Sequence, residues 1–316
     1  MEAAGGRLDL ALHELGAASA AVISPLAVVN THLTAVDLGV NRLGPTGALA
    51  LAEALACTRD KSHLRNISLF DNAIGPEGCE ALAAALPYTA VASLNLGDNG
   101  LGRELGRGLG ALCAALADCA SLTDLRLHRN NFSTAAAEMV VHALSGSSLV
   151  SLDLGVNALQ VEGARLFAEA LYNDCALTSL SLADNNVGME GAALLAEVIV
   201  SSPRLTQLNL DGTYLPLDEL RGDVAGTCVV ALDAKRLKFA SAVVIARLLR
   251  ANPQLTELNL RKNPITQQGA NVLAAALPAS QVRILRLGGA GLGLDGAKII
   301  AEAVKESQLI MLEMDE

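Results

Sequence analysis

A phrase of about 28 residues recurs along almost the whole chain of 316 residues. It reads Leu-Thr-Ala-Val-Asp-Leu-Gly-Val-Asn-Arg-Leu at 33–43, and closely similar phrases stand at 64–74 and 255–265. With the first residue of the phrase as position 1, the copies begin at residues 5, 33, 64, 91, 122, 149, 177, 205, 227, 255, 282 and 309. A repeat with a period of roughly 20 to 50 residues marks an array of stacked units. We therefore expect one elongated domain over 1–316, with an atypical first repeat at 1–32, rather than the two domains that length alone suggests.

Positions 4 and 6 of the phrase are apolar in every copy, and position 6 is Leu in all copies but the last, which has Met314. Alternation with period 2 predicts a strand with one buried side. A Gly-containing turn follows, and then apolar residues at helical spacing, as at 47–55. Such a strand–turn–helix unit can bury its apolar side only against the next copy. The pattern predicts an α/β solenoid with about 12 strands.

Position 9 of the phrase is Asn in most copies. Backbone donors and acceptors lose their ladder partners where the chain leaves a strand and turns inside a stack. An inward Asn amide offers both donors and an acceptor for these groups. We therefore predict a structural ladder of asparagines, formed by Asn41, Asn72, Asn99, Asn130, Asn157, Asn185 and Asn263.

The phrase LxxLxLxxNxL followed by a helix, mostly in units of 27–31 residues, resembles the leucine-rich repeats of the ribonuclease-inhibitor type. The repeat domains of NOD-like receptors and of Ran GTPase-activating protein are similar. The resemblance covers about residues 5–316 and implies a horseshoe, with parallel strands lining the concave side and helices on the convex side. It is specific for the fold and only weakly informative about function.

Composition narrows the partners and the compartment. The net charge is −10, which disfavours nucleic acid as a partner, because phosphate backbones reward clusters of Lys and Arg. The six cysteines show no CxxC spacing, so we expect reduced, mostly buried thiols in a cytoplasmic protein. The apolar stretch 17–29 lacks a basic leader and reads as an amphipathic helix rather than a signal peptide. No apolar run reaches the ~18 residues that span a membrane, so we expect no membrane insertion.

Two regions depart from the pattern. The copy at 205–228 is short and carries Pro216 and Gly222 where other copies have a full helix. It predicts a local break in curvature or a protruding loop, which is either a partner-specific feature or drift. At the other departure, the sequence stops at Glu316 just after a final strand at 309–314, without a polar cap. An exposed last layer is a liability, so we expect a partner or further chain to cover this edge.

Motifs that suggest chemistry have a structural interpretation here. Gly291, Gly293 and Gly296 form a GxGxxG after a strand, with Glu313 about 20 residues further on, as in dinucleotide-binding sites. Yet the same glycine pair recurs at other strand-to-helix turns of the array, so we expect no cofactor. The five histidines are scattered without metal-ligand spacing, and no nucleophile has a local signature. The sequence therefore predicts no metal site and no catalytic residue.

Positions 3, 5, 7 and 8 are expected to point from the strands into the concave side, where a partner would bind. Among them, Phe70 is predicted to be an exposed aromatic anchor. The expected surface is acidic with two basic islands. The candidate partner-binding residues are Phe70, Asp71, Asp98, Asp124, Arg126, His128, Arg129, Asp153, Asp184, Asp211, Glu257, Arg261, Lys262 and Arg286.

These features favour a non-catalytic intracellular interaction module or scaffold that binds another protein through the concave face. One alternative is a GTPase-activating protein, because 69–76 and 127–131 are similar to phrases of Ran GTPase-activating protein. Another is a structural subunit of a cytoskeletal or ciliary assembly. The scarcity of cysteine argues against a nuclease inhibitor.

Overall fold

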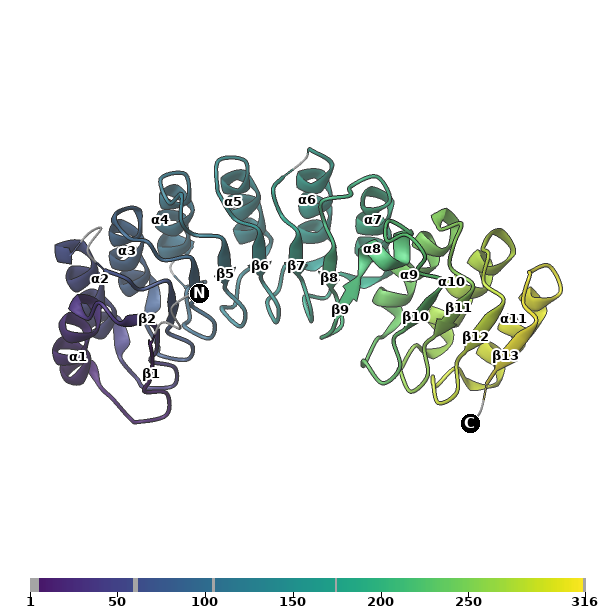
Figure 1. The fold of residues 1–316 in the computed structure, drawn as a ribbon, viewed down its shortest axis with the longest axis horizontal. Helices are drawn as coiled ribbons and strands as arrows, with labels where there is room; N and C mark the ends of the chain where they lie inside the picture. The colour runs from purple at the N-terminus through teal and green to yellow at the C-terminus, as the bar shows by residue number, and fades with distance from the viewer. Residues whose placement is uncertain (1–5, 59–61, 104–105, 174, 315–316) are drawn as a thin grey trace. The chain divides into compact units, whose positions relative to one another are not determined.

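The computed structural model of the chain describes residues 6–58, 62–103, 106–173 and 175–314. The chain divides into two compact units (Figure 1). Unit 1 is Met1–Leu159 with Cys175–Leu177, and unit 2 is Gln160–Asp174 with Thr178–Glu316. In each unit the strands lie side by side and the helices cover one side of them (Figure 1).

Strands and helices alternate along unit 1. Its strands are β1 (Gly6–Asp9), β2 (Leu33–Asp37), β3 (Asn66–Ser68), β4 (Ser93–Asn95), β5 (Asp124–Arg126) and β6 (Ser151–Asp153). Its helices are α1 (Ala17–Val29), α2 (Gly44–Thr58), α3 (Gly75–Ala85), the short 3-10 helix η2 (Leu86–Tyr88), α4 (Arg107–Leu116) and α5 (Thr134–Leu144).

Unit 2 contains the same alternation with one interruption. Its strands are β7 (Ser179–Ser181), β8 (Gln207–Asn209), β9 (Tyr214–Pro216), β10 (Val229–Ala231), β11 (Glu257–Asn259), β12 (Ile284–Arg286) and β13 (Met311–Glu313). Its helices are α6 (Gln160–Tyr172), α7 (Gly188–Ile199), α8 (Leu217–Arg221), α9 (Phe239–Ala251), α10 (Thr266–Ala276), the 3-10 helix η4 (Leu277–Ala279) and α11 (Gly293–Val304).

Consecutive strands of unit 1 pair in parallel from β1 to β6. The register aligns position 4 of each copy with position 4 of the next, as in Ile67 beside Leu94 and Leu94 beside Leu125. Equal repeats therefore stack without slippage, and the predicted α/β solenoid is confirmed in each unit.

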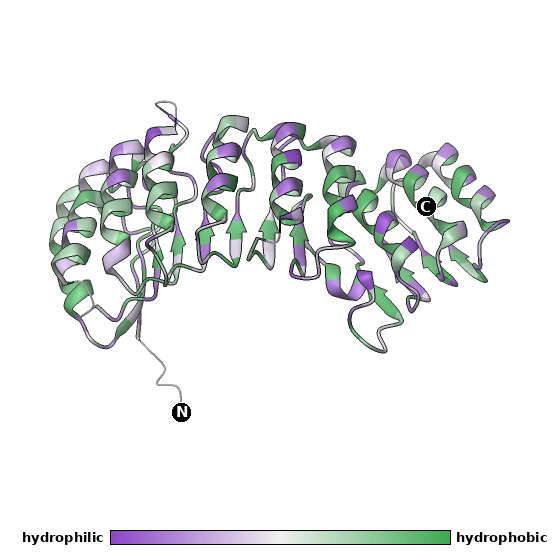
Figure 2. Ribbon diagram, turned by 90° about the horizontal axis from the view of Figure 1, so that it is seen from above, coloured by the Kyte–Doolittle hydropathy of each residue, from purple (hydrophilic) through white to green (hydrophobic). Residues whose placement is uncertain are grey.

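The core of each unit is the column of apolar residues at positions 4, 6 and 11. Leu94, Leu96 and Leu101 are each at most 1% exposed and represent one complete layer. The helices add small residues, mainly Ala, on the side that faces the strands, and they alternate hydrophobic with hydrophilic stretches along their length (Figure 2). Leu and Ala are large enough to fill the core, because each layer is thin and is covered by the layers on both sides.

The asparagines at position 9 connect one layer to the next. The Oδ1 of Asn130 accepts hydrogen bonds from the backbone N–H of Asn99 at 3.0 Å and of Leu101 at 3.2 Å, both in the preceding copy. Its Nδ2 donates back to the carbonyl of Leu96 at 2.9 Å. Asn41, Asn72, Asn99, Asn157 and Asn263 make the same bonds to the copies before them. The side-chain amides thus satisfy backbone groups that no strand or helix can pair.

The sheet of unit 2 is interrupted after β8. Strand β7 pairs with β8 in parallel, whereas β9 pairs with β8 antiparallel, with Leu208 opposite Leu215. Strands β10 to β13 form a separate parallel ladder. The prediction of about 12 strands is confirmed: β1 to β8 and β10 to β13 fall in the twelve predicted copies, and the described residues add one antiparallel strand, β9, where the chain at 214–216 folds back on β8.

The short copy at 205–228 has little helix, as expected: α8 has five residues and ends at Arg221, followed by Gly222, whose φ is +87°. Arg221 fills the space beneath it, with its side chain only 5% exposed. Its guanidinium donates to the carbonyls of Ile199 and Ser202 at 2.8 and 3.0 Å and to those of two further residues in the turn after α7. Asn252 donates to the last carbonyls of α8. In this region, hydrogen bonds from Arg221 and Asn252 thus take the place of the full helix that other copies have.

The first and last copies also form strands. The described part of the atypical repeat at 1–32 contains β1 and α1, and its residues 1–5 lie outside the described part. At the other end, β13 pairs with β12, and Leu294 and Ile310 are 73% and 79% exposed. The cover expected over this edge stays a prediction, and Asp315 and Glu316 lie outside the described residues.

The cysteines correct one expectation, because only two of the six are buried. Cys79 and Cys119 are buried, Cys113 and Cys175 are partly exposed, and Cys57 and Cys228 are exposed; all six are free thiols. Burial, with smaller contributions from Cys113 and Glu80, raises the pKa of Cys79 from 9.0 to about 12, and burial alone raises the pKa of Cys113 to about 12. For Cys119, burial and then Asp118 raise the pKa to about 11.

A prediction about alkylation follows from these pKa values. A pKa raised by about three units leaves on the order of a thousandfold less thiolate near neutral pH, and the thiolate is the nucleophile. At pH 8 we expect iodoacetamide to modify Cys57 and Cys228 and to spare Cys79 and Cys113 in the native protein. Peptide mapping by mass spectrometry measures this, and denatured protein, in which all six thiols should react, is the control. Equal native rates at Cys79 and Cys228 would contradict the prediction.

Candidate functional site

The candidate site is the strand face, by which we mean the open side of the strands in each unit, opposite the helices (Figure 1). Positions 3 and 5 of each copy lie on this face within the strands, and position 7 lies just after them. Asp124, Arg126 and His128 illustrate the three positions in one copy, and all three are at least partly exposed. Both units present such a face.

Position 8 differs from the expectation. It does not point out of a strand but lies in the turn that follows, with left-handed backbone conformation. Asp71, Asp98, Arg129, Asp184 and Lys262 have φ between +51° and +58°. The backbone N–H groups of Asp71, Asp98, Arg129 and Lys262 reach across to the next copy, as Asp98 N does to the carbonyl of His128 at 2.8 Å. Within each unit, these residues therefore lie in the turns along the edge of the strand face, which we call the turn row.

A pair of aromatic rings lies in the middle of the strand face of unit 1. Phe70 and His128 stack with ring centroids 5.4 Å apart and an angle of 23° between the ring planes. They come from copies two apart, and the copy between them has Gly97 at the same position. A Cβ on Gly97 would lie only 2.5 Å from the His128 ring, so glycine is what permits the stack. Phe70 is thus half-buried, not the freely exposed residue that the sequence suggested.

An acid on the next copy faces the other side of His128. The Nδ1 of His128 lies 3.2 Å from Oδ2 of Asp153. The backbone N–H of Gly155 donates to the other carboxylate oxygen of Asp153 at 2.9 Å and so fixes its orientation. Phe70, His128 and Asp153 therefore form one fixed row of side chains across four copies.

The expected basic island of unit 1 is neutralised by its own neighbours. Arg126 pairs with Asp124 at 3.2 Å, and Arg129 lies 3.9 Å from Asp98. Such exposed pairs contribute about 0–1 kcal/mol each to stability. Their main consequence is a surface of mixed charge rather than a basic patch.

The second basic island, in unit 2, is also paired. Arg286 lies 2.7 Å from Glu257 and 3.7 Å from Glu313, and Arg261 pairs with Glu313 as well. Glu313 was not among the residues predicted for the binding surface. Glu313 stands at position 5 of its copy, and Arg286 stands at position 5 of the copy before. Because equal positions pair on adjacent strands, the repeat could have predicted that the two side chains are neighbours.

Two more candidate residues of unit 2 lie in the turn row. Asp184 pairs with Lys238 at 3.3 Å, and both side chains are about half exposed. Lys262 is exposed. These residues are accessible, and the ring stack formed by Phe70 belongs to unit 1.

Asp211 was predicted to be on the binding surface, and this is wrong. It is only 8% exposed, and its Oδ2 accepts hydrogen bonds from the N–H groups of Lys238 and Ser241, both at 2.9 Å. These groups belong to the first turn of α9. A carboxylate stabilises such a terminus because it satisfies free N–H groups and the positive end of the helix dipole. Asp211 is therefore a capping residue of the irregular repeat.

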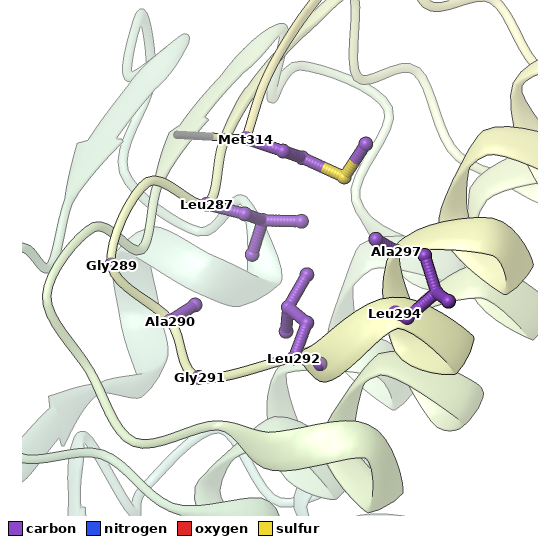
Figure 3. A pocket seen from close by; sticks show the side chains of 9 residues that line it. Leu287, Gly289, Ala290, Gly291, Leu292, Leu294, Ala297 and Met314 are labelled. Atoms are coloured by element: carbon purple, nitrogen blue, oxygen red, sulfur yellow. The ribbon is translucent and has the colours of Figure 1, made fainter. Parts of the chain in front are cut away.

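The GxGxxG turn lines a cavity of ≈350 Å³ at the end of unit 2. Figure 3 shows Leu287, Leu292 and Met314 extending into the space between the last strands and α11. Every residue that lines it is Gly, Ala, Leu or Met. A dinucleotide phosphate would meet no cation there, and Glu313 is engaged by the arginines. The lining is that of a repeat core.

No group of three or more His, Cys, Asp and Glu side chains lies close enough to hold a metal ion among the residues that the structure describes. Across the same residues, every helix is too short or too polar to cross a bilayer.

Comparisons with known proteins agree on the repeat. A family model described as leucine-rich repeat matches residues 29–52, 60–83, 173–196 and 251–274. The leucine-rich repeat-containing protein LegL7 from Legionella pneumophila is similar at 21% identity and a TM-score of 0.50, over 95% of this chain and 91% of that one. An internalin, inlF, from Listeria monocytogenes aligns at 18% identity and a TM-score of 0.41, over 93% and 72% of the two chains. TLR13, solved as a complex with ssRNA13, aligns at 19% identity and 0.38, over 90% and 42%.

A comparison with curated protein sequences finds no significant match. The repeated phrase, the strand–turn–helix coils and the family model together make this chain a leucine-rich repeat protein. At these levels of identity, the likeness to solved structures concerns the fold alone.

Proposed function

We propose that this protein is a non-catalytic protein-binding module, an intracellular scaffold or recognition domain, whose partner binds the strand face of unit 1. Leucine-rich repeat proteins generally mediate protein–protein interactions, which supports the coarser part of the proposal. The observation that carries the finer part is the Phe70–His128 stack. A rigid aromatic pair in the centre of an otherwise polar face has the character of an interface anchor.

The remaining features of the proposal follow from composition and fold. We propose the ribonuclease-inhibitor type of repeat, because the regular coils carry helices of 10 to 15 residues. We propose a cytoplasmic location, because all six cysteines are free thiols. A protein is favoured over nucleic acid as the partner, because the arginines of the face are paired with acids.

The GTPase-activating alternative gains no support from the site. Asn72 and Asn130, which carry much of the similarity to those phrases, are buried and hold the ladder together. Nothing in the site favours the cytoskeletal alternative over a general scaffold either.

Affinity capture from native cells, read by mass spectrometry, tests the proposal. We expect the double variant Arg126→Glu/Arg129→Glu to lose the partners that the unchanged protein recovers, because both side chains flank His128 on the strand face. The matched control is Arg103→Glu/Arg107→Glu, which makes the same charge change just before and at the start of α4, and it should keep them. Recovery of every partner by the strand-face variant would contradict the proposal.

A further inference from the structure

Position 7 of unit 1 alternates between glycine and a ring. Along the copies that begin at 33, 64, 91, 122 and 149, the residues are Gly39, Phe70, Gly97, His128 and Gly155. The ring of His128 leans over Gly97, whose absent side chain leaves the room, and reaches Phe70. On this face, an aromatic ring from the next copy can therefore fill the space over a glycine.

The space over Gly39 is not filled in this way. Because the two rings are nearly parallel, His128 covers one face of Phe70 and the opposite face is directed towards the copy that contains Gly39. The nearest atoms to a Cβ on Gly39 are Oδ1 of Asp37 at 3.2 Å, the Phe70 carbonyl at 3.5 Å and Oγ of Ser68 at 3.8 Å. None of these is a ring atom, and among the residues that the structure describes Phe70 has no second ring partner like His128.

One carboxylate borders this space, and another follows Phe70 in the chain. Asp37 is held by the N–H of Gly39 at 3.0 Å and by the guanidinium of Arg7 at 3.1 Å. Arg7 is 62% exposed, so a guanidinium already sits on this carboxylate from the solvent side. Asp71, next to Phe70 in the chain, is exposed and has no ion pair within the described residues. A second guanidinium near Phe70 thus has an exposed acid available one residue further along the chain.

We propose that the exposed face of Phe70 over Gly39 receives an arginine side chain of the partner protein. A guanidinium is planar, stacks on aromatic faces and pairs with carboxylates, whereas a lysine ammonium offers only a point charge. The proposal rests on the proposed function and adds the chemistry of the contact: the guanidinium lies on Phe70, over Gly39, and pairs with Asp71. The chain's net charge of −10 also favours a partner segment that is basic.

The test uses small probes on the full chain. N-acetylarginine methylamide is titrated into ¹⁵N-labelled protein, and the backbone amide signals of Gly39, Phe70 and Asp71 are followed by NMR. We expect these signals to shift in a saturable way. The matching citrulline derivative, which keeps the shape without the charge, should bind about tenfold more weakly, as should the lysine derivative.

Two variants locate the contact. Gly39→Phe fills the space over the glycine and should abolish the response, whereas Val156→Phe, at an exposed turn position of the same face, should retain it. Phe70→Leu removes the ring with little change in volume and should also abolish the response. The same spectra show whether each variant is folded.

The outcomes separate this inference from the proposed function. Equal binding of the arginine and citrulline derivatives, stronger binding of N-acetylphenylalanine methylamide, or an unchanged response in Gly39→Phe would overturn the inference. If the capture experiment still depends on Arg126 and Arg129, the proposed function stands without it. If the Arg126→Glu/Arg129→Glu variant still recovers every partner while the arginine derivative still binds, only the proposed function is overturned.

Discussion

Asn130→Ala is expected to lower the free energy of unfolding by about 3 kcal/mol or more. The Asn130 side chain is buried at 0% exposure and accepts from two backbone N–H groups, those of Asn99 and Leu101. Each buried donor left without a partner costs about 1–3 kcal/mol. Alanine also removes the donor to the Leu96 carbonyl, and no water can take its place in a close-packed layer.

Urea unfolding followed by circular dichroism measures the effect, with Asn66→Ala as the matched control. Asn66 is exposed on β3, so the same truncation there should change stability by less than about 0.5 kcal/mol. If Asn130→Ala were as stable as Asn66→Ala, the ladder would not hold the layers together.

Arg221→Met is expected to destabilise unit 2 by about 3–5 kcal/mol, the range found when one partner of a buried charged network is removed. Its guanidinium satisfies carbonyls at Ile199, Ser202, Pro203 and Leu205, where α7 ends and no full helix follows. Methionine fills similar volume but donates nothing. Four carbonyls would then lose one donor each.

Hydrogen exchange resolves which part of the chain responds to Arg221→Met. We expect faster exchange in α7, α8 and β9, while the β2–β5 ladder of unit 1 keeps its protection. Arg283→Met is the control, because Arg283 is exposed beside β12 and the same substitution there removes no buried donor. Unchanged protection around α8 would show that the irregular repeat does not depend on Arg221.

The leucine periodicity predicted the layers well because it is a local signal. Whether position 4 or 6 is buried depends on a few neighbouring residues, and every copy repeats them. Strand direction is a different matter. Leu215 is buried, as position 11 is in the other copies that begin between 33 and 282, yet it lies in a strand that runs antiparallel to β8. A buried residue in a pattern does not encode which way its strand runs.

The candidate site was predictable as a face but not as a set of contacts. Asp211 occupies a surface position in the phrase and is buried only because α9, some 30 residues later, begins beside it. The Phe70–His128 stack likewise joins residues 58 positions apart. Its signal in the sequence was the glycine at position 7 in alternate copies, which a count of charged and aromatic residues does not reveal.

A hydrogen-exchange map of the protein bound to a captured partner tests most directly whether the partner binds the strand face of unit 1. If it does, we expect slower exchange at the turns after β3, β4 and β5, with exchange in the helices α3, α4 and α5 unchanged. Protection confined to those helices, with the turns around Phe70 and His128 exchanging as in the free protein, would contradict it.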